Sequence, residues 1–167
     1  MNNGEGGYCL TSDQKKLVTV KQLDLNSLAS IKEFSDAIIA DKNMNIDYLI
    51  CNAGIMAVKT REETVDGFEK QVGVNHFGHA YLVDTLYDTI TTSAKKRNAD
   101  ARIVVLASSA HNMGSVKPDD LHYTNGRSYN AWGSYGQSKL CNILFATALE
   151  KKLTADGFSA NVTAMSV

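Results

Sequence analysis

Several features that mark particular classes of protein are missing from this sequence. Its 17 basic and 18 acidic residues nearly balance, giving a net charge of −1, and they are scattered along the chain. Nothing in that pattern indicates a surface for nucleic acid or for an anionic membrane. The longest apolar-rich run, residues 48–58, is too short to span a bilayer, and the first residues lack the apolar core of a targeting signal. We therefore expect a soluble protein of the cytoplasm or an organelle, without a membrane segment.

Cysteine is also scarce. Cys9, Cys51 and Cys141 are far apart, and two of them lie within apolar runs. This usage favours reduced, packed thiols over disulfides or a zinc site. His76 and His79 are three residues apart, but no carboxylate or thiol lies beside them at ligand spacing, so no metal site is predicted. With 44% hydrophobic residues among 167, the chain is long enough for one domain with a sizeable core.

Hydrophobic periodicity predicts strands that alternate with helices. The expected elements, in chain order, are a strand at 17–25, a helix at 27–40, a strand at 47–51, a long helix with Thr64 as its N-cap, a strand at 102–107 buried on both faces, a helix at 133–153 and a strand at 159–165. The only proline, Pro118, lies in a polar connection between the third strand and the last helix. This order predicts an α/β fold: a Rossmann-like, doubly wound parallel sheet covered on both faces.

Polar motifs fall where these strands end. Asp24-Leu25 ends the first strand, Asn52-Ala53-Gly54 the second and Ser108-Ser109 the third. Because the carboxyl ends of parallel strands meet at one edge of a sheet, one crevice could collect them all. Each motif also has an ordinary structural explanation: a turn at Asn52–Gly54, satisfied backbone groups at the serines, and a helix cap at Asp24.

Tyr135 and Lys139 carry the clearest chemical signal. They are four residues apart at the start of a predicted helix, so both side chains lie on one face. A phenol is a poor acid or base at neutral pH, but a neighbouring cation favours the phenolate, which can then exchange a proton with a substrate oxygen. The spacing therefore suggests interconversion of a carbonyl and an alcohol. Alone it is weak evidence, because such pairs occur in many helices for packing and solvation.

In this order the motifs resemble the short-chain dehydrogenase/reductase family. The resemblance runs from about residue 17 to residue 167 and rests on Cys51-Asn-Ala-Gly54, Asn75, the serine pair and Tyr135-x-x-x-Lys139. Asn75-His-Phe-Gly-His79 and Gly136-Gln-Ser-Lys-Leu-Cys-Asn142 are most similar to the branch that holds retinol dehydrogenases, the WW-domain oxidoreductase and light-dependent protochlorophyllide reductase.

The resemblance implies an NAD(P)-dependent enzyme and assigns roles within it. Tyr135 would be the proton donor or acceptor, Ser109 rather than Ser108 would hold the substrate oxygen, and Lys139 would bind the nicotinamide ribose. Asn75 would hold a water that links Lys139 to solvent. Asp24 and Leu25 would contact the adenine, and Asn52, Ala53 and Gly54 would let backbone approach the cofactor. The branch favours NADP, with NAD possible, and a bulky apolar small-molecule substrate.

The resemblance also shows what this sequence does not contain. The family normally begins with a strand and a Thr-Gly-x-x-x-Gly-x-Gly turn that binds the pyrophosphate, and Gly4, Gly6 and Gly7 cannot replace that turn. We therefore expect residues 1–16 to be a flexible tail and 17–167 a partial NAD(P)-binding domain without the first βαβ unit or the C-terminal strand and lid. The strand ending at Cys51 should expose an edge, and the 167-residue chain should bind NADPH poorly.

Three functions therefore stay open at this point. The first is an NAD(P)-dependent oxidoreductase acting on a carbonyl, an alcohol or a related double bond. The second is a truncated, catalytically inert fragment that acts through protein association. The third, which the Asn52–Gly54 motif disfavours, is a sugar-nucleotide epimerase or dehydratase. The predicted helix at 133–153 is apolar nearly all round, which suits either a homodimer contact or a buried core helix.

Overall fold

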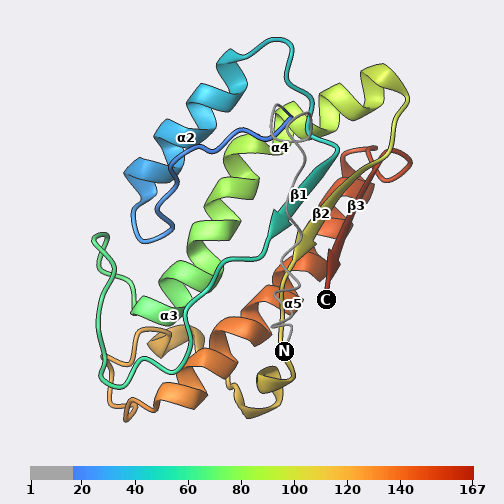
Figure 1. Ribbon diagram of the computed structural model, residues 1–167. Helices are drawn as coiled ribbons and strands as arrows, with labels where there is room; N and C mark the ends of the chain where they lie inside the picture. The colour runs from blue at the N-terminus through green and yellow to red at the C-terminus, as the bar shows by residue number, and fades with distance from the viewer. Residues whose placement is uncertain (1–16) are drawn as a thin grey trace, which may run out of the picture.

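The computed structural model describes residues 17–167, so the predicted tail at 1–16 lies outside the described residues. The elements of this part of the chain are α2 (Leu28–Ala40), β1 (Tyr48–Cys51), α3 (Lys70–Val72), the π-helical turn η1 (Gly73–Phe77), α4 (Gly78–Arg97), β2 (Ala101–Val105), the 3₁₀ helices η2 (Ser109–Met113) and η3 (Pro118–Asp120), α5 (Ala131–Ala155) and β3 (Val162–Ser166) (Figure 1). Strands and helices alternate as expected, and α2, β1, β2, α5 and β3 lie within a few residues of their predicted positions.

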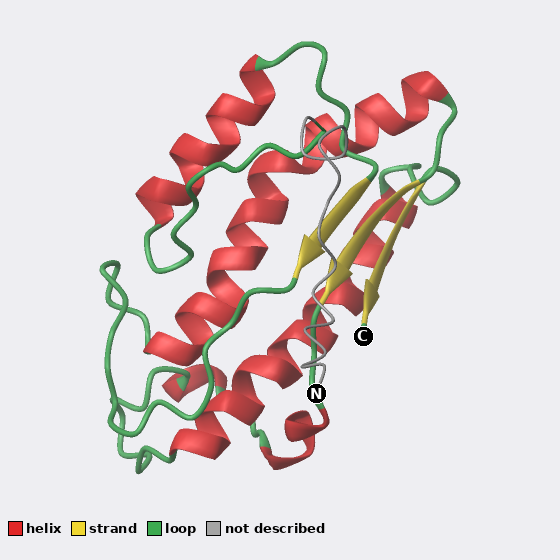
Figure 2. Cartoon of the chain, viewed as in Figure 1, coloured by secondary structure: helices red, strands yellow, loops and turns green. Residues whose placement is uncertain are grey.

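The three strands form one parallel sheet in the order β1-β2-β3 (Figure 2). Tyr48 is aligned with Arg102, and Arg102 is aligned with Thr163. The chain therefore has the predicted α/β, Rossmann-like architecture. The core lies between this sheet and the long helices, where Leu86, Ile103 and Leu153 are fully buried.

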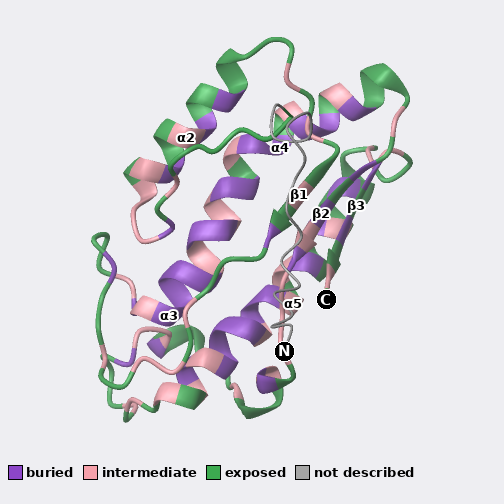
Figure 3. Ribbon diagram, viewed as in Figure 1, coloured by how far each residue is buried: buried purple, intermediate pink, exposed green. Residues whose placement is uncertain are grey.

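In the described part of the chain, helices cover one face of the sheet. The strands follow one another in the same direction, so right-handed crossovers place α4 and α5 on the same side. Ile103 and Val105 on the face toward these helices are buried, whereas Tyr48 and Ile50 on the other face are 64% and 60% exposed. Figure 3 shows where buried and exposed residues lie along the strands and the helices beside them. The expectation that β2 is buried on both faces is wrong, because Arg102 is exposed.

Strand β1 has a free outer edge among the described residues, because its only strand partner there is β2. This is the exposed edge expected for the strand ending at Cys51. Its backbone groups on that side have no ladder partner in residues 17–167, which is the condition under which a sheet edge can pair with another chain.

The strand predicted at 17–25 does not form. Residues 17–24 are mostly exposed and make no strand pairing within the described chain. Alternating apolar residues gave the segment strand propensity, but a strand is stabilised by the neighbour it pairs with. The segment instead leads into the cap of α2, where the Asp24 carbonyl accepts from Ser27 N at 3.2 Å and Ser27 Oγ accepts from Ser30 N at 3.3 Å.

Thr64 is not a helix cap. The helix begins at Lys70, after Glu69, whose carboxylate accepts hydrogen bonds from the backbone N–H groups of Gln71 and Val72. Thr64 Oγ1 accepts from Phe68 N at 3.1 Å in a turn that precedes the helix. Both residues are suitable cap types, and periodicity alone could not show which one begins the helix.

No helix in residues 17–167 is long and apolar enough to cross a membrane.

Candidate active site

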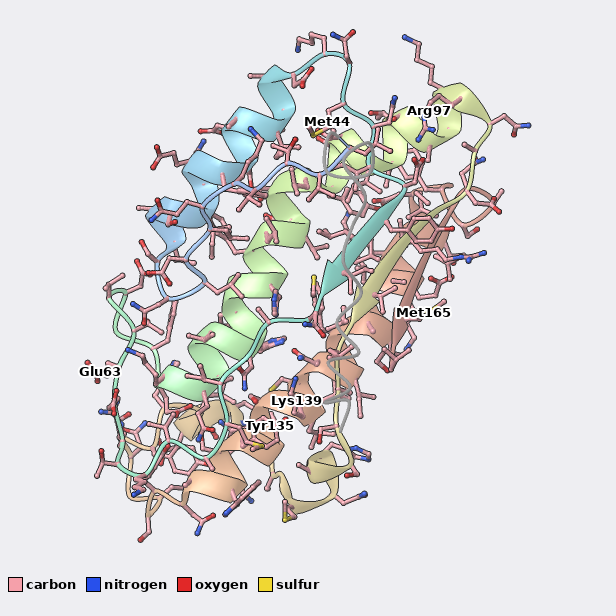
Figure 4. The ribbon with its side chains drawn as sticks, viewed as in Figure 1. Met44, Glu63, Arg97, Tyr135, Lys139 and Met165 are labelled. Carbon is pink, nitrogen blue, oxygen red and sulfur yellow. The ribbon has the colours of Figure 1, made fainter. Side chains whose placement is uncertain are left out.

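A cavity of about 230 Å³ lies at the carboxyl ends of β1 and β2, beside the first turns of α5. Its lining comes from three segments that are far apart in the sequence: Asn52, Gly54, Ile55, Met56, Leu106, Ala107, Ser108, Tyr135 and Lys139. Figure 4 shows Tyr135 and Lys139 projecting from α5 next to each other at this end of the sheet. The structure therefore brings four predicted site residues, Asn52, Gly54, Tyr135 and Lys139, to one cavity.

Lys139 is the charged group of the cavity. Its side chain is buried, its Nζ donates a hydrogen bond to the Leu106 carbonyl at 2.9 Å, and Nζ lies 5.7 Å from the centroid of the Tyr135 ring. Burial lowers the pKa of Lys139 below its usual value. The geometry thus places an ammonium beside a phenol in a site of restricted water access, where charge interactions are stronger than at the surface.

Asn75 joins the segment after β1 to helix α5. It lies in the π-helical turn η1 and is fully buried. Its amide exchanges two hydrogen bonds with the backbone of Ile55, accepting from Ile55 N at 2.8 Å and donating to Ile55 O at 2.8 Å. Nδ2 also donates to Ser138 Oγ at 3.0 Å. Asn75 therefore fixes the backbone that forms one wall of the cavity.

Gly54 allows this close approach. A Cβ at position 54 would lie 2.9 Å from Asn75 Oδ1 and 3.9 Å from Lys139 Nζ. Any side chain here would occupy the space between the β1 segment and Lys139. The absence of a side chain therefore keeps the cavity open beside Lys139. Close approach of a cofactor to Asn52–Gly54 stays a prediction of the resemblance.

Of the two serines that follow β2, Ser108 lines the cavity. Its Oγ accepts from Ala110 N at 3.2 Å, so it also caps η2. Ser109 is the first residue of η2, is exposed and does not belong to the lining. The position of the cavity thus favours Ser108, whereas the sequence interpretation preferred Ser109.

Helix η2 packs tightly on α5 through two glycines. A Cβ at Gly136 would lie 2.5 Å from the Ala110 carbonyl oxygen and 2.7 Å from Gly114 N, and a Cβ at Gly114 would lie 2.3 Å from the backbone of Gly136. Because both contacts are with backbone, neither neighbour can give way cheaply. This contact sets the distance between the serine segment and Tyr135, which directly precedes Gly136.

Asp24 and Leu25 do not reach this cavity. Asp24 is exposed, and its Oδ1 accepts from Asn26 N at 2.9 Å, while Leu25 is buried in the core. Ala53 is exposed beside the cavity but is not among its lining residues. Adenine contacts at Asp24 and Leu25 therefore stay predictions of the resemblance.

Comparisons with known proteins identify the family of this chain. The family model described as short chain dehydrogenase matches residues 9–119. The chain belongs to the short-chain dehydrogenase family. Over 86% of this chain, the sequence is 42% identical to human retinol dehydrogenase 13. Over 88% of this chain, it is 37% identical to the chicken WW domain-containing oxidoreductase. A crystal structure of a protein from Mycobacterium paratuberculosis has a TM-score of 0.73 at 39% identity and covers 87% of the chain.

This short-chain dehydrogenase chain spans part of the length of those proteins. The matches cover 41% of the human relative, 35% of the chicken relative and 48% of the mycobacterial structure. The activity, substrates and partners of the relatives are therefore properties of those longer proteins. The retinol dehydrogenase-like branch indicated by the sequence is confirmed.

Two histidines, His76 and His79, follow Asn75 in η1 and in the first turn of α4. Nδ1 of His79 is 3.1 Å from the Asn75 carbonyl oxygen, which can only accept, so His79 carries its proton on Nδ1. Burial lowers the pKa of His79 and of His76 below the usual 6.5.

Among the described residues no group of three or more His, Cys, Asp or Glu side chains could hold a metal ion. Cys51 and Cys141 are free, and burial raises the pKa of these thiols to about 12 and about 11.

The buried histidines predict a loss of stability in mild acid. Because the pKa of His79 is lower in the folded protein, the unfolded chain binds the extra proton first as the pH falls. The free energy of unfolding should therefore decrease below about pH 6.5, by about 1.4 kcal/mol for each unit of pKa difference. Urea unfolding between about pH 5 and pH 8 measures this effect. His79→Gln keeps a donor for Asn75 but cannot titrate, so its profile should be flatter; a slope equal to that of the wild type would contradict the prediction.

The sequence interpretation missed two residues of the site. Ser138 Oγ donates to the Tyr135 carbonyl at 2.7 Å, and Asn142 Nδ2 donates to the Leu106 carbonyl at 2.9 Å. Asn142 did have a signal, since it is a polar residue in a mostly apolar helical stretch and lies three residues after Lys139.

The homodimer contact through residues 133–153 stays a prediction. On that helix Leu144 is 53% exposed.

Proposed function

We propose that this short-chain dehydrogenase is an NAD(P)-dependent oxidoreductase that interconverts a carbonyl and an alcohol, or reduces a related double bond, on a bulky apolar substrate. The observation that carries the proposal is the single cavity in which Tyr135, Lys139 and Ser108 meet. Membership of the family supports the redox class, and the names of the retinol dehydrogenase relatives support an alcohol or aldehyde as substrate.

The cavity suits a nicotinamide cofactor. Gly54 presents no side chain beside Lys139, and the hydrogen bond to Leu106 uses one of the three N–H groups of the ammonium. The other two can donate to ribose hydroxyls, and Asn52 lies at the same wall. When bound, the cofactor supplies or removes the hydride. We favour NADP over NAD because of the branch that the sequence resembles.

The protein groups then manage the proton and the substrate oxygen. Tyr135 gives a proton to the carbonyl oxygen in reduction and takes it from the alcohol in oxidation. The positive charge of Lys139 stabilises the phenolate that forms, and the Ser108 hydroxyl donates a hydrogen bond to the same substrate oxygen. Asn75 holds the cavity wall in place. The backbone carbonyl of Asn75 already accepts hydrogen bonds from His79 and Asn142, so in our proposal Asn75 has a positioning role.

The choice between the two serines gives a direct test. Turnover of NADPH and NADH should be measured with a panel of aldehydes and ketones, using the purified protein and two variants. Ser108→Ala should lower kcat/KM by about 10²-fold or more, as expected when a hydrogen bond to the reacting oxygen is removed. Ser109→Ala is the matched control and should stay within about threefold of the wild type, because single exposed substitutions have small effects. The opposite ranking would assign the role to Ser109.

A second candidate function is protein association. The observation that favours it is that, within residues 17–167, the outer edge of β1 has no strand partner and Tyr48 and Ile50 are exposed on the sheet face that no helix covers. The same turnover assay separates the two functions. A protein that oxidises neither NADPH nor NADH with any substrate of the panel would leave association as the better proposal.

A further inference from the structure

Asn142 occupies an unusual position for an amide. It lies seven residues after Tyr135 and three after Lys139 on α5, so all three share one side of the helix. It is only 1% exposed and lies in the stretch 140–149, whose residues are apolar apart from Asn142 and Thr147. Burying an amide is costly unless its polar atoms are hydrogen-bonded.

Both donors of this amide serve the site. Nδ2 donates to the Leu106 carbonyl at 2.9 Å and to the Asn75 carbonyl at 3.1 Å. The Leu106 carbonyl is also the acceptor that holds the Lys139 ammonium, at 2.9 Å. One backbone oxygen therefore binds both side chains, and Asn142 ties the end of β2, the turn η1 and helix α5 together.

The two carbonyls set the orientation of the Asn142 amide. Both carbonyls can only accept, so the nitrogen of Asn142 must face them and Oδ1 must face outward. There Oδ1 is 3.2 Å from His76 Nδ1, which must then be the donor. In this orientation the Nδ1–H form of His76 completes the hydrogen bonds of the Asn142 side chain.

From these contacts we infer that Asn142 is a positioning residue, which fixes the Leu106 carbonyl and through it the Lys139 ammonium beside Tyr135. The kinetic meaning of this inference rests on the proposed function, in which Lys139 binds the cofactor and stabilises the phenolate. The placement of Lys139 by Asn142 does not depend on that function and can be measured separately.

The central variant is Asn142→Leu, which has the same number of side-chain heavy atoms but no hydrogen-bond donor and no charge that could attract the Lys139 ammonium. Chemical acetylation of Lys139 by acetic anhydride, followed by mass spectrometry, reports how well the buried ammonium is held. We expect Lys139 to react about tenfold faster or more in the variant, as loss of a buried hydrogen bond allows. Affinity for NADPH, from fluorescence titration, and kcat/KM should each fall by about the same factor.

The matched control is Thr91→Val on α4. Thr91 is fully buried, and its hydroxyl donates to the Tyr87 carbonyl at 2.8 Å, so the variant loses a buried hydrogen bond without touching the site. Its Lys139 reactivity and NADPH affinity should stay within about twofold of the wild type. Urea unfolding of both variants shows whether their stabilities are comparable. His76→Ala, which removes the partner of Asn142 Oδ1 together with ring contacts to Phe77 and Phe145, leaves both donors of Asn142 in place and should give a smaller acceleration, about threefold.

The outcomes distinguish the two proposals. Lys139 reacting at the wild-type rate in Asn142→Leu would overturn the positioning role. A wild-type protein with neither NADPH binding nor turnover would overturn the proposed function, while the acetylation rates would still decide the role of Asn142. If Asn142→Leu does not fold, Asn142→Ser and His76→Ala take its place, and wild-type reactivity of Lys139 in both would overturn the inference.

Discussion

Replacing Tyr135 with phenylalanine should lower kcat by about 10²–10⁴-fold, the usual contribution of a positioned proton donor. The change removes one hydroxyl and leaves the ring, which packs edge-on against Trp132 with centroids 6.3 Å apart. Folding should therefore be unaffected, and the loss should lie in the chemical step. Steady-state turnover with the best substrate of the panel, for both nicotinamide cofactors, measures it.

The control for this change is Tyr48→Phe. Tyr48 is 64% exposed on β1, and losing its hydroxyl should leave kcat unchanged. NADPH affinity should be similar in both variants, because Lys139, not Tyr135, is the group proposed to hold the ribose. Turnover that survives in Tyr135→Phe would show that the tyrosine does not carry the proton.

Adding one methyl group at Gly136 should damage both stability and activity. The new Cβ would lie 2.5 Å from the Ala110 carbonyl oxygen, so η2 must move away from α5. Overpacking of this kind costs about 1–3 kcal/mol. The displacement also carries Ser108 away from Tyr135, so kcat/KM should fall by at least tenfold, since misplacing reacting groups by a small distance is expensive.

Gly133→Ala is the comparison variant for Gly136→Ala. Gly133 lies in the first turn of the same helix, and its Cβ would come no closer than 3.4 Å to the Asn130 side chain. Its free energy of unfolding should be unchanged or slightly raised, because alanine favours helix over glycine. Urea unfolding and turnover compare the two. Equal behaviour of both alanine variants would show that the contact between η2 and α5 does not constrain the site.

Much of the candidate site could be predicted from local sequence. Tyr135 and Lys139 share a helix face because of their spacing, and Asn52 and Gly54 lie at the strand end because parallel strands share one carboxyl edge. Asn75 was placed correctly as a polar residue within a helical segment, but the π-helical turn that carries it was not predicted. Such a turn depends on the tertiary packing of its segment and leaves no periodicity of its own.

The other differences between the sequence-based expectations and the structure have a common cause, which is that partners distant in sequence decide them. The segment 17–25 had strand propensity but no strand beside it in the described chain. Ser108 and Ser109 are adjacent, and only the packing of η2 on α5 determines which hydroxyl lines the cavity. Asn142 was visible as a polar exception, but its two acceptors belong to β2's end and to η1, which no local pattern connects to α5.

The parallel register also bears on how the molecule reaches its folded state. Neighbouring strands pair residues far apart along the polypeptide, Tyr48 with Arg102 and Arg102 with Thr163. Closing such distant pairs is entropically expensive and slows the search for the native topology. Helices α4 and α5 can acquire local order early, but the cavity needs the ends of β1 and β2 and the first turns of α5 together. We therefore expect the cavity to assemble late in folding, once the last of these long-range contacts has formed.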